Sequence, residues 1–416
     1  MTSVATPPVP GGKSGPINLA VIGFGDRARS VVREIRAVDE QVRVVAVGDP
    51  HRNEERAAEL PDARWYDDPV AALDHPGIDG VVIGSPNAAH WQQAVAVLER
   101  NLPLFLEKPV VVDWHEHRAV SAAATASSSP VVVSFPLRLT PMVVQLQELI
   151  KRIGPVMHVQ AVNNVPSYGV GAMFHGWRRD QSLSGGMWME KATHDLDYLT
   201  LLVGAQPVDV VAMEAQGVFR GTVPAGTLCR SCDHAATCPE SPEAMQRIDD
   251  PVMRSPYWQP DSWQCVFGED STNHDAGTAI IRYDNGAQVV YSQNFYSRRG
   301  AAARGGKLVG HRGTIEFDFF SGVVKVIDHF SDQVDTHDTT TAQPHFGGDA
   351  ELARTFVAAC RGVASSDAPL EAGLTSAAVA LAARESCRTG AVVAVPSVAA
   401  AAAVGGTASV ASAVRA

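Results

Sequence analysis

The chain has 416 residues, of which 45% are hydrophobic and 19% charged, and its formal net charge at pH 7 is −11. This composition excludes a largely disordered chain and predicts a soluble protein of two or three domains. The acidic balance argues against a nucleic-acid-binding protein, which normally carries a basic face. No apolar run reaches membrane-spanning length, and the first residues lack a secretory or twin-arginine signal. We therefore expect a cytoplasmic protein with neither nucleic-acid nor membrane partners.

The chain divides by pattern into two domains between two tails. Residues 1–16 and 397–416 are rich in small residues and Pro, lack an amphipathic pattern, and are expected to be disordered. Residues 17–137 alternate short apolar runs with helical stretches, which predicts a Rossmann-type α/β domain with a parallel sheet. Residues 138–396 contain many strand-like runs and an Asp284–Gly286 turn, which predicts an α+β domain with a large, open, mostly antiparallel sheet. Two late helical stretches are expected to pack back on the first domain.

A glycine-rich turn joins the first predicted strand to the first predicted helix and reads GxGxxA. Gly23 permits the tight turn, Gly25 lets a pyrophosphate approach the backbone, and Ala28 lets the helix pack on the strand. The helix N-terminus adds N–H donors for phosphate oxygens. Asp49 ends the second strand, where a carboxylate accepts ribose hydroxyls and repels a 2′-phosphate, so NAD is favoured over NADP. The predicted cofactor contacts here are Gly23, Phe24, Gly25, Asp26, Arg27, Ala28 and Asp49.

Further motifs follow along the chain. They are Gly84–Asn87 with His90, Glu107-Lys108-Pro109, Arg138, Gly185-Gly186 followed by Glu190, His194 and Asp197, then His345–Asp349 and Ala372–Leu374. In combination they resemble the glucose–fructose oxidoreductase / inositol dehydrogenase / MocA (Gfo/Idh/MocA) family, from which the chain departs by having Glu190 for Asp and Ala192 for Gly. The resemblance implies further cofactor contacts from Ser85, Pro86, Asn87, His90, Glu107 and Lys108.

The chemistry can be argued from residue type. Oxidation of a secondary alcohol needs a proton acceptor beside the hydroxyl, and a histidine titrates near neutrality, which suits His194 to this role. Helical spacing places Glu190 and Asp197 on the face that carries His194. Lys108 lies at a strand end, where α/β proteins bind ligands, and can orient the hydroxyl. The resemblance implies that Lys108 and His194 both touch that hydroxyl. We predict Lys108, His194 and Glu190 as catalytic, with a structural salt bridge as the alternative for Glu190.

Substrate contacts are predicted around the same segment. Trp177 precedes the pair Arg178 and Arg179, and paired arginines bind anions well, although a solvated loop is the favoured interpretation of this pair. Lys191 adds a cation, and His345 precedes two glycines in a loop that can line a pocket. The predicted substrate residues are Arg138, Trp177, Arg178, Asp197, Lys191 and His345.

A cysteine-containing insert at 226–265 is poor in periodic apolar residues. Its spacing is Cys-x2-Cys-x5-Cys with a later fourth cysteine, which suits a closed structural zinc site. The predicted ligands are Cys229, Cys232, Cys238 and Cys265, with His234 and His274 in reserve. Reduced thiols, a disulfide and an iron–sulfur cluster remain as alternatives.

These observations predict an NAD-dependent dehydrogenase that transfers hydride from a secondary hydroxyl of a sugar, cyclitol or glycoside. The resemblance also implies a homodimer or homotetramer assembled through the exposed face of the second sheet. One alternative is a redox-neutral, NAD-dependent glycoside hydrolase that oxidises, eliminates, hydrates and reduces, acting on an anionic glycoside such as a sulfoquinovoside. Another is a non-catalytic, cofactor-binding regulator.

Overall fold

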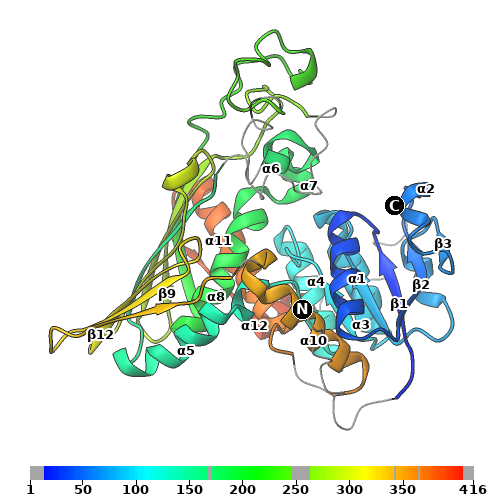
Figure 1. Ribbon diagram of the computed structural model, residues 1–416, viewed down its shortest axis with the longest axis horizontal. Helices are drawn as coiled ribbons and strands as arrows, with labels where there is room; N and C mark the ends of the chain where they lie inside the picture. Colours follow the sequence, from blue (N-terminus) through cyan, green and yellow to red (C-terminus); the bar gives the residue numbers. More distant parts are fainter. Residues whose placement is uncertain are drawn as a thin grey trace. The chain divides into compact units, whose positions relative to one another are not determined.

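The computed structural model describes residues 14–166, 171–242, 244, 263–341, 343–363 and 366–405. These residues form two compact units (Figure 1). The first unit contains the described residues up to Thr140, those within 342–377, and those from Ser397 onward. The second contains the described residues of Pro141–Thr341 and Ala378–Pro396. The rest of the predicted tails lies outside the described residues.

The described part of the first unit contains a six-stranded sheet whose strands all pair in parallel. Its strands are β1 (Ile17–Ile22), β2 (Val42–Gly48), β3 (Arg64–Tyr66), β4 (Gly80–Ile83), β5 (Leu104–Leu106) and β6 (Val131–Val133). The order is β3-β2-β1-β4-β5-β6, so the direction of winding reverses between β1 and β4. Apolar runs buried on both faces predict such a sheet, and the predicted Rossmann architecture is confirmed.

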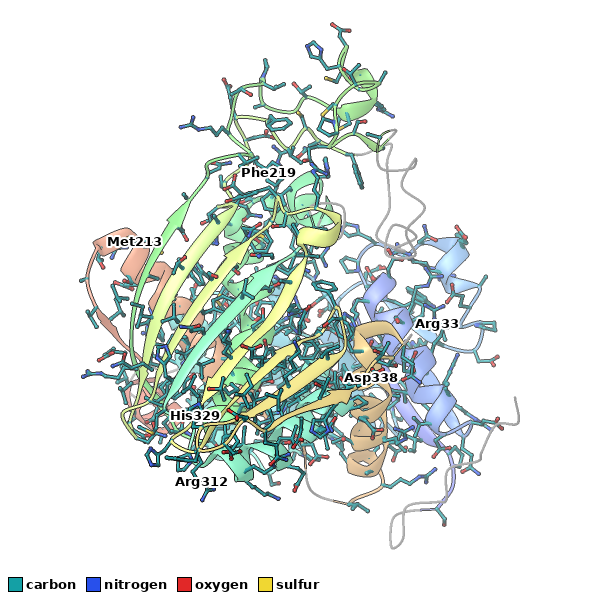
Figure 2. All side chains as sticks on the ribbon, turned by 60° about the vertical axis from the view of Figure 1, so that its left-hand side comes forward. Arg33, Met213, Phe219, Arg312, His329 and Asp338 are labelled. Carbon is teal, nitrogen blue, oxygen red and sulfur yellow. The ribbon has the colours of Figure 1, made fainter. Side chains whose placement is uncertain are left out.

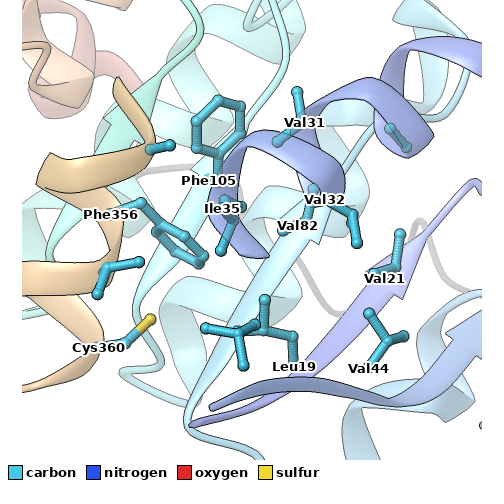
Figure 3. Close-up of a cluster of buried hydrophobic side chains, with 14 of the residues drawn as sticks. Leu19, Val21, Val31, Val32, Ile35, Val44, Val82, Phe105, Phe356 and Cys360 are labelled. Carbon is cyan, nitrogen blue, oxygen red and sulfur yellow. The ribbon is translucent and has the colours of Figure 1, made fainter. Parts of the chain in front are cut away.

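Helices cover this sheet. They are α1 (Asp26–Val38), α2 (Glu54–Ala57), α3 (His90–Glu99), α4 (Trp114–Ala126), α10 (Gly348–Cys360), α12 (Val398–Gly405) and the start of α11 (Leu370–Thr389), with helical turns η1 (Val70–Asp74), η2 (Asn87–Ala89), η3 (Pro136–Leu139) and η11 (Pro344–Gly347). One face of α1 buries Val31, Val32 and Ile35, and Figure 3 shows this face in the core beside Phe105 and Phe356. Each fully buried side chain of this size stabilises the fold by roughly 1.5–3 kcal/mol, so α1 and the glycine-rich turn before it are firmly held.

The start of the predicted C-terminal tail is ordered. Residues 398–405, expected to be disordered, form α12, which contacts α4 and buries Ala401. The segment is mostly alanine, which has the highest intrinsic helix propensity, and the contact with α4 supplies the burial that a helix of this length needs. Sequence reasoning missed it because an alanine run has no amphipathic pattern.

The second unit contains a nine-stranded sheet in its described residues. The order is β14-β13-β12-β11-β7-β10-β9-β8-β15, and of the described pairings only β7–β10 is parallel. The strands are β7 (His158–Asn164), β8 (Pro207–Ala215), β9 (Ala276–Tyr283), β10 (Gln288–Asn294), β11 (Ala303–Val309), β12 (Gly313–Asp318), β13 (Val323–Asp328), β14 (Val334–Asp338) and β15 (Val393–Ala394). The predicted turn at Asp284–Gly286 joins β9 to β10, and the mostly antiparallel sheet is confirmed.

One face of this sheet is buried and the other is open. On β9, Ala279, Ile281 and Tyr283 are buried while Ile280 between them is 46% exposed, as expected for a sheet covered on one side. Met213 on β8 is also exposed, and both Met213 and Phe219 are labelled in Figure 2.

The helical elements of this unit are α5 (Pro141–Ile153), α6 (Gly171–His175), η5 (Trp177–Arg179), α7 (Gln181–Ser184), a π-helical turn (Trp188–Ala192), α8 (Thr193–Val203), η7 (Cys229–Ser231), η10 (Arg299–Ala301) and the end of α11. No helix in the described ranges is both long and apolar enough to cross a membrane.

Candidate active site

The glycine-rich turn lies at the ends of β1 and β4, where the winding of the first sheet reverses. Gly23 has φ +75°, and a Cβ added there would lie 2.6 Å from the backbone of Ser85, so only glycine fits. Gly25 caps α1 with no side-chain hydrogen bond, and a Cβ added there would meet no atom within 4 Å. Gly25 therefore leaves open space beside the first N–H groups of α1, the arrangement that admits a phosphate.

Two further contacts complete this nucleotide site. A Cβ added at Gly84 would lie 2.8 Å from Cβ of Ala28, so both positions must stay small for the turn after β4 to lie against α1. Asp49 accepts hydrogen bonds from the backbone N–H groups of Phe24 and His51, each at 2.9 Å. The carboxylate is thus held beside the turn, and its remaining lone pairs can accept ribose hydroxyls. These residues fit a dinucleotide: Gly25 would leave room for its pyrophosphate, and Asp49 would accept its ribose hydroxyls.

His90 braces the loop that carries Lys108. Its two ring nitrogens lie 2.7 Å from the carbonyl oxygen of Pro109 and 2.9 Å from that of Ser85, and the side chain is buried. Burial lowers the pKa of His90, while the two backbone hydrogen bonds oppose that shift. His90 therefore connects the loop after β4 to the Glu107–Pro109 loop after β5, and both of these loops are predicted to bind the cofactor.

Arg27 connects three segments of the first unit. Its guanidinium contacts Glu107 at 2.8 Å, the hydroxyl of Ser134 at 3.0 Å and both oxygens of Asp349, at 2.8 and 3.3 Å. Burial disfavours the charged form of Asp349, but hydrogen bonds and charge from His345 and Arg27 outweigh it, so the pKa of Asp349 lies well below its usual range. Removing one member of such a buried set typically costs about 3–5 kcal/mol. Sequence reasoning placed Asp349 in a family motif but gave it no role; its spacing from His345 was the available signal.

His345 stands on a strained loop. His345 and Phe346 have φ +45° and +54°, values that residues with a side chain rarely adopt. The imidazole Nδ1 lies 2.7 Å from Asp349, and the His345 side chain remains 45% exposed. Two features keep the loop in this conformation. Arg27 binds Asp349, and Gly348 packs so closely that an added Cβ would lie 1.9 Å from the carbonyl oxygen of Pro136. The predicted substrate residue His345 is thus rigidly presented, and the same unit buries Arg138 on η3.

The predicted catalytic segment of the second unit begins with the π-helical turn. Glu190 is buried on this turn, and its carboxylate lies 3.5 Å from Arg178. The Arg178 guanidinium lies 4.4 Å from the ring centre of Trp177, which is partly exposed. The ion pair proposed as the alternative role of Glu190 is therefore present. Helical spacing predicted that Glu190 and His194 share one regular α-helix. Glu190 instead lies on the π-helical turn that precedes α8, and π-helical turns occur frequently at functional sites.

The remaining predicted residues of this segment follow on α8. His194 is half-buried in its first turn, Asp197 is buried one turn later, and Lys191 is half-buried on the π-helical turn. Glu190, Lys191, His194 and Asp197 thus lie on one continuous helical stretch of the second unit. Lys108, Arg138 and His345 belong to the first unit.

Packing and hydrogen bonds connect the insert to its surroundings. The ring of His175 stacks on Trp263 with centroids 4.0 Å apart, and its Nδ1 lies 2.7 Å from the carbonyl oxygen of Gln264. Burial lowers the pKa of His175 to about 4. Arg179 is buried and contacts Asp270 at 2.9 Å and the Gln264 side chain at 3.1 Å. Arg179 is therefore a structural residue that joins the insert, through Gln264, to Asp270.

The zinc prediction is not supported. Cys229, Cys232, Cys238 and Cys265 are free cysteines, and the residues that the structure describes contain no group of three or more His, Cys, Asp or Glu side chains that could hold a metal. Burial, together with the charges of the three other thiols, raises the pKa of Cys229 to about 12. The reserve ligand His274 is instead hydrogen-bonded to Gln293 and Glu214.

Comparison with known families agrees with this geometry. Residues 17–135 match the family model described as "Oxidoreductase family, NAD-binding Rossmann fold" (GFO_IDH_MocA), and residues 147–395 match its C-terminal alpha/beta domain. The chain belongs to the Gfo/Idh/MocA oxidoreductase family. The resemblance inferred from the sequence motifs is confirmed.

Individual relatives of this family member are distant. Bacillus subtilis oxidoreductase YteT is 27% identical over 61% of this chain and 64% of its own length. The scyllo-inositol 2-dehydrogenase (NAD(+)) of the same organism is 26% identical over 47% of this chain and 56% of its own length. The matches thus span less than two thirds of either relative. A levoglucosan dehydrogenase structure in complex with NADH and levoglucosan superposes with a TM-score of 0.70 at 18% identity, covering 92% of this chain and all of that one.

Proposed function

We propose that the protein is an NAD-dependent dehydrogenase that oxidises a secondary hydroxyl of a sugar or cyclitol. One observation carries the proposal: the nucleotide site at Gly23–Ala28 and Asp49 is connected to the loop that contains Lys108. Arg27 makes this connection through Glu107, and His90 makes it through the carbonyl oxygens of Ser85 and Pro109. The names of the relatives support the substrate class, since they act on inositols and bind levoglucosan.

In this proposal each residue has one task. The N–H groups at the start of α1 bind the pyrophosphate, and Asp49 accepts the ribose hydroxyls. When bound, NAD supplies the acceptor for the hydride that leaves the substrate carbon. Lys108 donates a hydrogen bond to the substrate oxygen and stabilises the negative charge that develops there. His194 accepts the proton of the same hydroxyl.

Asp49 supports NAD rather than NADP as the cofactor. Its carboxylate is held beside the turn by two backbone N–H groups, so a 2′-phosphate would meet a fixed negative charge. Arg52, a basic residue three positions after Asp49, contacts Glu54 at 3.2 Å and lies 5.7 Å from the ring centre of Trp65.

The dehydrogenase is preferred to the hydrolase of anionic glycosides because the arginine pair that suggested an anion has carboxylate partners. Arg178 faces Glu190 and Arg179 faces Asp270.

We further infer a homo-oligomer, since Met213, Ile280 and Val334 are exposed on strands of the second sheet. Light scattering at micromolar concentration tests this inference, and a monomeric mass contradicts it.

The test of the activity uses purified full-length protein with NAD and a panel of inositols, levoglucosan, free sugars and nitrophenyl glycosides. We expect NADH to accumulate in step with substrate loss. Nitrophenolate release that needs NAD without net NADH would establish the hydrolase instead. His194→Gln is expected to lower kcat about 100-fold, whereas His329→Gln, which changes an exposed histidine of the same unit, is expected to keep the wild-type rate.

A further inference from the structure

The helical stretch that carries Glu190 and His194 is tied to the second sheet at both ends by buried polar side chains. One tie is Asp195, in the first turn of α8, and the other is Trp188, at the start of the π-helical turn. Both side chains are buried. Glu190, Lys191 and His194 lie between them in the chain.

The Asp195 tie is a fully buried carboxylate with donors from three strands. Arg304 on β11 lies 2.8 Å from one oxygen. The hydroxyl of Tyr291 on β10 lies 3.0 Å from the other oxygen, which also accepts a hydrogen bond from the Asn163 side chain on β7. Burial and the Asp195 charge raise the pKa of Tyr291 well above its usual value, so its hydroxyl keeps the proton it donates. A buried carboxylate with this set of donors holds a defined position.

The Trp188 tie reaches the same sheet through β8. The indole N–H of Trp188 donates to Oε2 of Glu214 at 2.7 Å, and His274 contacts the same oxygen at 3.0 Å. The other ring nitrogen of His274 lies 3.0 Å from the side-chain amide of Gln293. Gln293 lies two residues from Tyr291 on β10, and their side chains are 3.3 Å apart. The two ties are therefore parts of one connected hydrogen-bond network.

The composition of the network favours positioning over proton transport. The amide of Gln293 separates His274 from Tyr291, and an amide is a poor carrier of protons. The network connects α8 and the π-helical turn to four strands of the sheet, β11, β7, β10 and β8. Such a connection resists rotation and sliding of the helical stretch on the sheet, because each shift would leave buried polar groups without partners.

We propose that Tyr291, Asp195 and Glu214 are positioning residues that fix the orientation of His194 for proton transfer. The proposal rests on the catalytic role of His194 proposed above. Proton and hydride transfer demand close placement of the reacting groups, and a displacement of about 1 Å costs on the order of 100-fold in rate. A rigid support under both ends of a short catalytic segment supplies that placement.

A matched pair of tyrosines tests the proposal. Tyr283 on β9 is as buried as Tyr291, and its hydroxyl lies 3.0 Å from Thr200, farther along the same helix. Tyr283→Phe and Tyr291→Phe each remove one hydroxyl, so both are expected to destabilise the protein by a similar amount in urea unfolding. Only Tyr291→Phe is expected to lower kcat, about tenfold, with little change in KM for NAD. Equal kcat values in the two variants would overturn the proposal.

A second pair tests the Trp188 tie by conservative rescue. Trp188 and His274 both contact Oε2 of Glu214, so the amide oxygen of Glu214→Gln can replace it, whereas Glu214→Leu removes it. We expect near-wild-type kcat for Glu214→Gln and a loss of about tenfold for Glu214→Leu. A loss of the same size in both, or in neither, contradicts positioning through this oxygen.

A readout independent of catalysis separates this proposal from the proposed function. Amide hydrogen exchange over residues 188–196 is expected to be faster in Tyr291→Phe than in Tyr283→Phe, because the local opening of the helical stretch becomes easier. If the wild-type protein oxidises no alcohol with NAD, the proposed dehydrogenase activity is rejected. The exchange data then decide by themselves whether the Tyr291 network stabilises residues 188–196. Identical exchange in the two variants overturns it.

Discussion

The glycine-rich turn at Gly23–Ala28 and the insert at 226–265 are both recognisable from residue spacing, but they are built differently. In the turn, each glycine meets a local backbone demand: a positive φ at Gly23, and open space at Gly25. In the insert, four cysteines were expected to converge on one ion. Among the described residues, no group of three or more His, Cys, Asp or Glu side chains could hold a metal, and the insert is packed against its surroundings through the stacking of Trp263 on His175.

The difference lies in the distance over which each motif must act. A turn motif works through the backbone between a strand and the helix that follows it, so its spacing in the chain is close to its spacing in space. A four-cysteine site requires side chains from separate loops to meet in tetrahedral geometry. Spacing alone therefore predicts the turn better than the metal site.

The largest expected effect is at the braced loop beside the turn. Lys108→Met removes the cation proposed to stabilise the substrate oxygen, and kcat is expected to fall about 1,000-fold. NAD affinity, measured by titration calorimetry, should fall far less than kcat, because the other predicted cofactor contacts remain. Lys151→Met is the control, because Lys151 is an exposed lysine of α5. A Lys108→Met variant with wild-type kcat would remove the lysine from the mechanism.

Two glycine variants separate cofactor binding from folding. Gly25→Ala places a methyl group in the open space at the start of α1, and NAD affinity is expected to fall about thirtyfold, equivalent to ~2 kcal/mol, with an unchanged melting temperature. Gly23→Ala puts a Cβ against Ser85 at a positive φ, and is expected to destabilise the fold by about 2–3 kcal/mol. Calorimetry and urea unfolding measure the two effects. A large loss of stability in Gly25→Ala would contradict the open approach.

The insert gives a pH-dependent prediction. The pKa of His175 is about 4 in the fold against 6.5 when unperturbed, so folding favours the neutral ring. Its contribution to stability is complete above the unfolded value and is lost as the pH falls from about 6.5 towards 4. At about pH 5 the loss is on the order of 2 kcal/mol. Urea unfolding of His175→Gln at neutral pH and about pH 5 should therefore show a weaker pH dependence than the wild type.

Trp263→Phe is the matched control for this experiment. It weakens the stacking on His175 but keeps the titrating ring, so the pH dependence should remain. Equal loss of stability on acidification in His175→Gln and the wild type would contradict this prediction. The acid sensitivity would then have a cause other than protonation of His175.

The smallest expected effect concerns cofactor choice. Asp49→Ser removes the fixed charge beside the ribose site while keeping a hydroxyl that can accept the N–H groups of Phe24 and His51. The preference for NAD over NADP, measured as the ratio of kcat/KM values, is expected to narrow about tenfold. An unchanged ratio would mean that another group excludes the 2′-phosphate.

Much of the fold could be predicted because its patterns are local. Apolar runs predicted the parallel strands, strand-like runs predicted the mostly antiparallel second sheet, and Asp284–Gly286 predicted the turn between β9 and β10. The helix α12 could not be predicted from amphipathic periodicity, since residues 398–405 are nearly uniform in polarity and the helix is supported by its contact with α4. For the site, the glycines and the family motifs were visible, but the partner of each charged side chain was not.

The sequence by itself determined the family, the two-sheet architecture and the residues of the nucleotide turn, because these follow from backbone requirements and from patterns within short segments. Tertiary structure alone decided that Glu190 pairs with Arg178, that Arg27 joins Glu107 to Asp349, and that Asp195 meets Tyr291 on a strand far along the chain. These pairings depend on which distant side chains folding brings within hydrogen-bond distance, and burial then makes each pairing strong enough to hold the site.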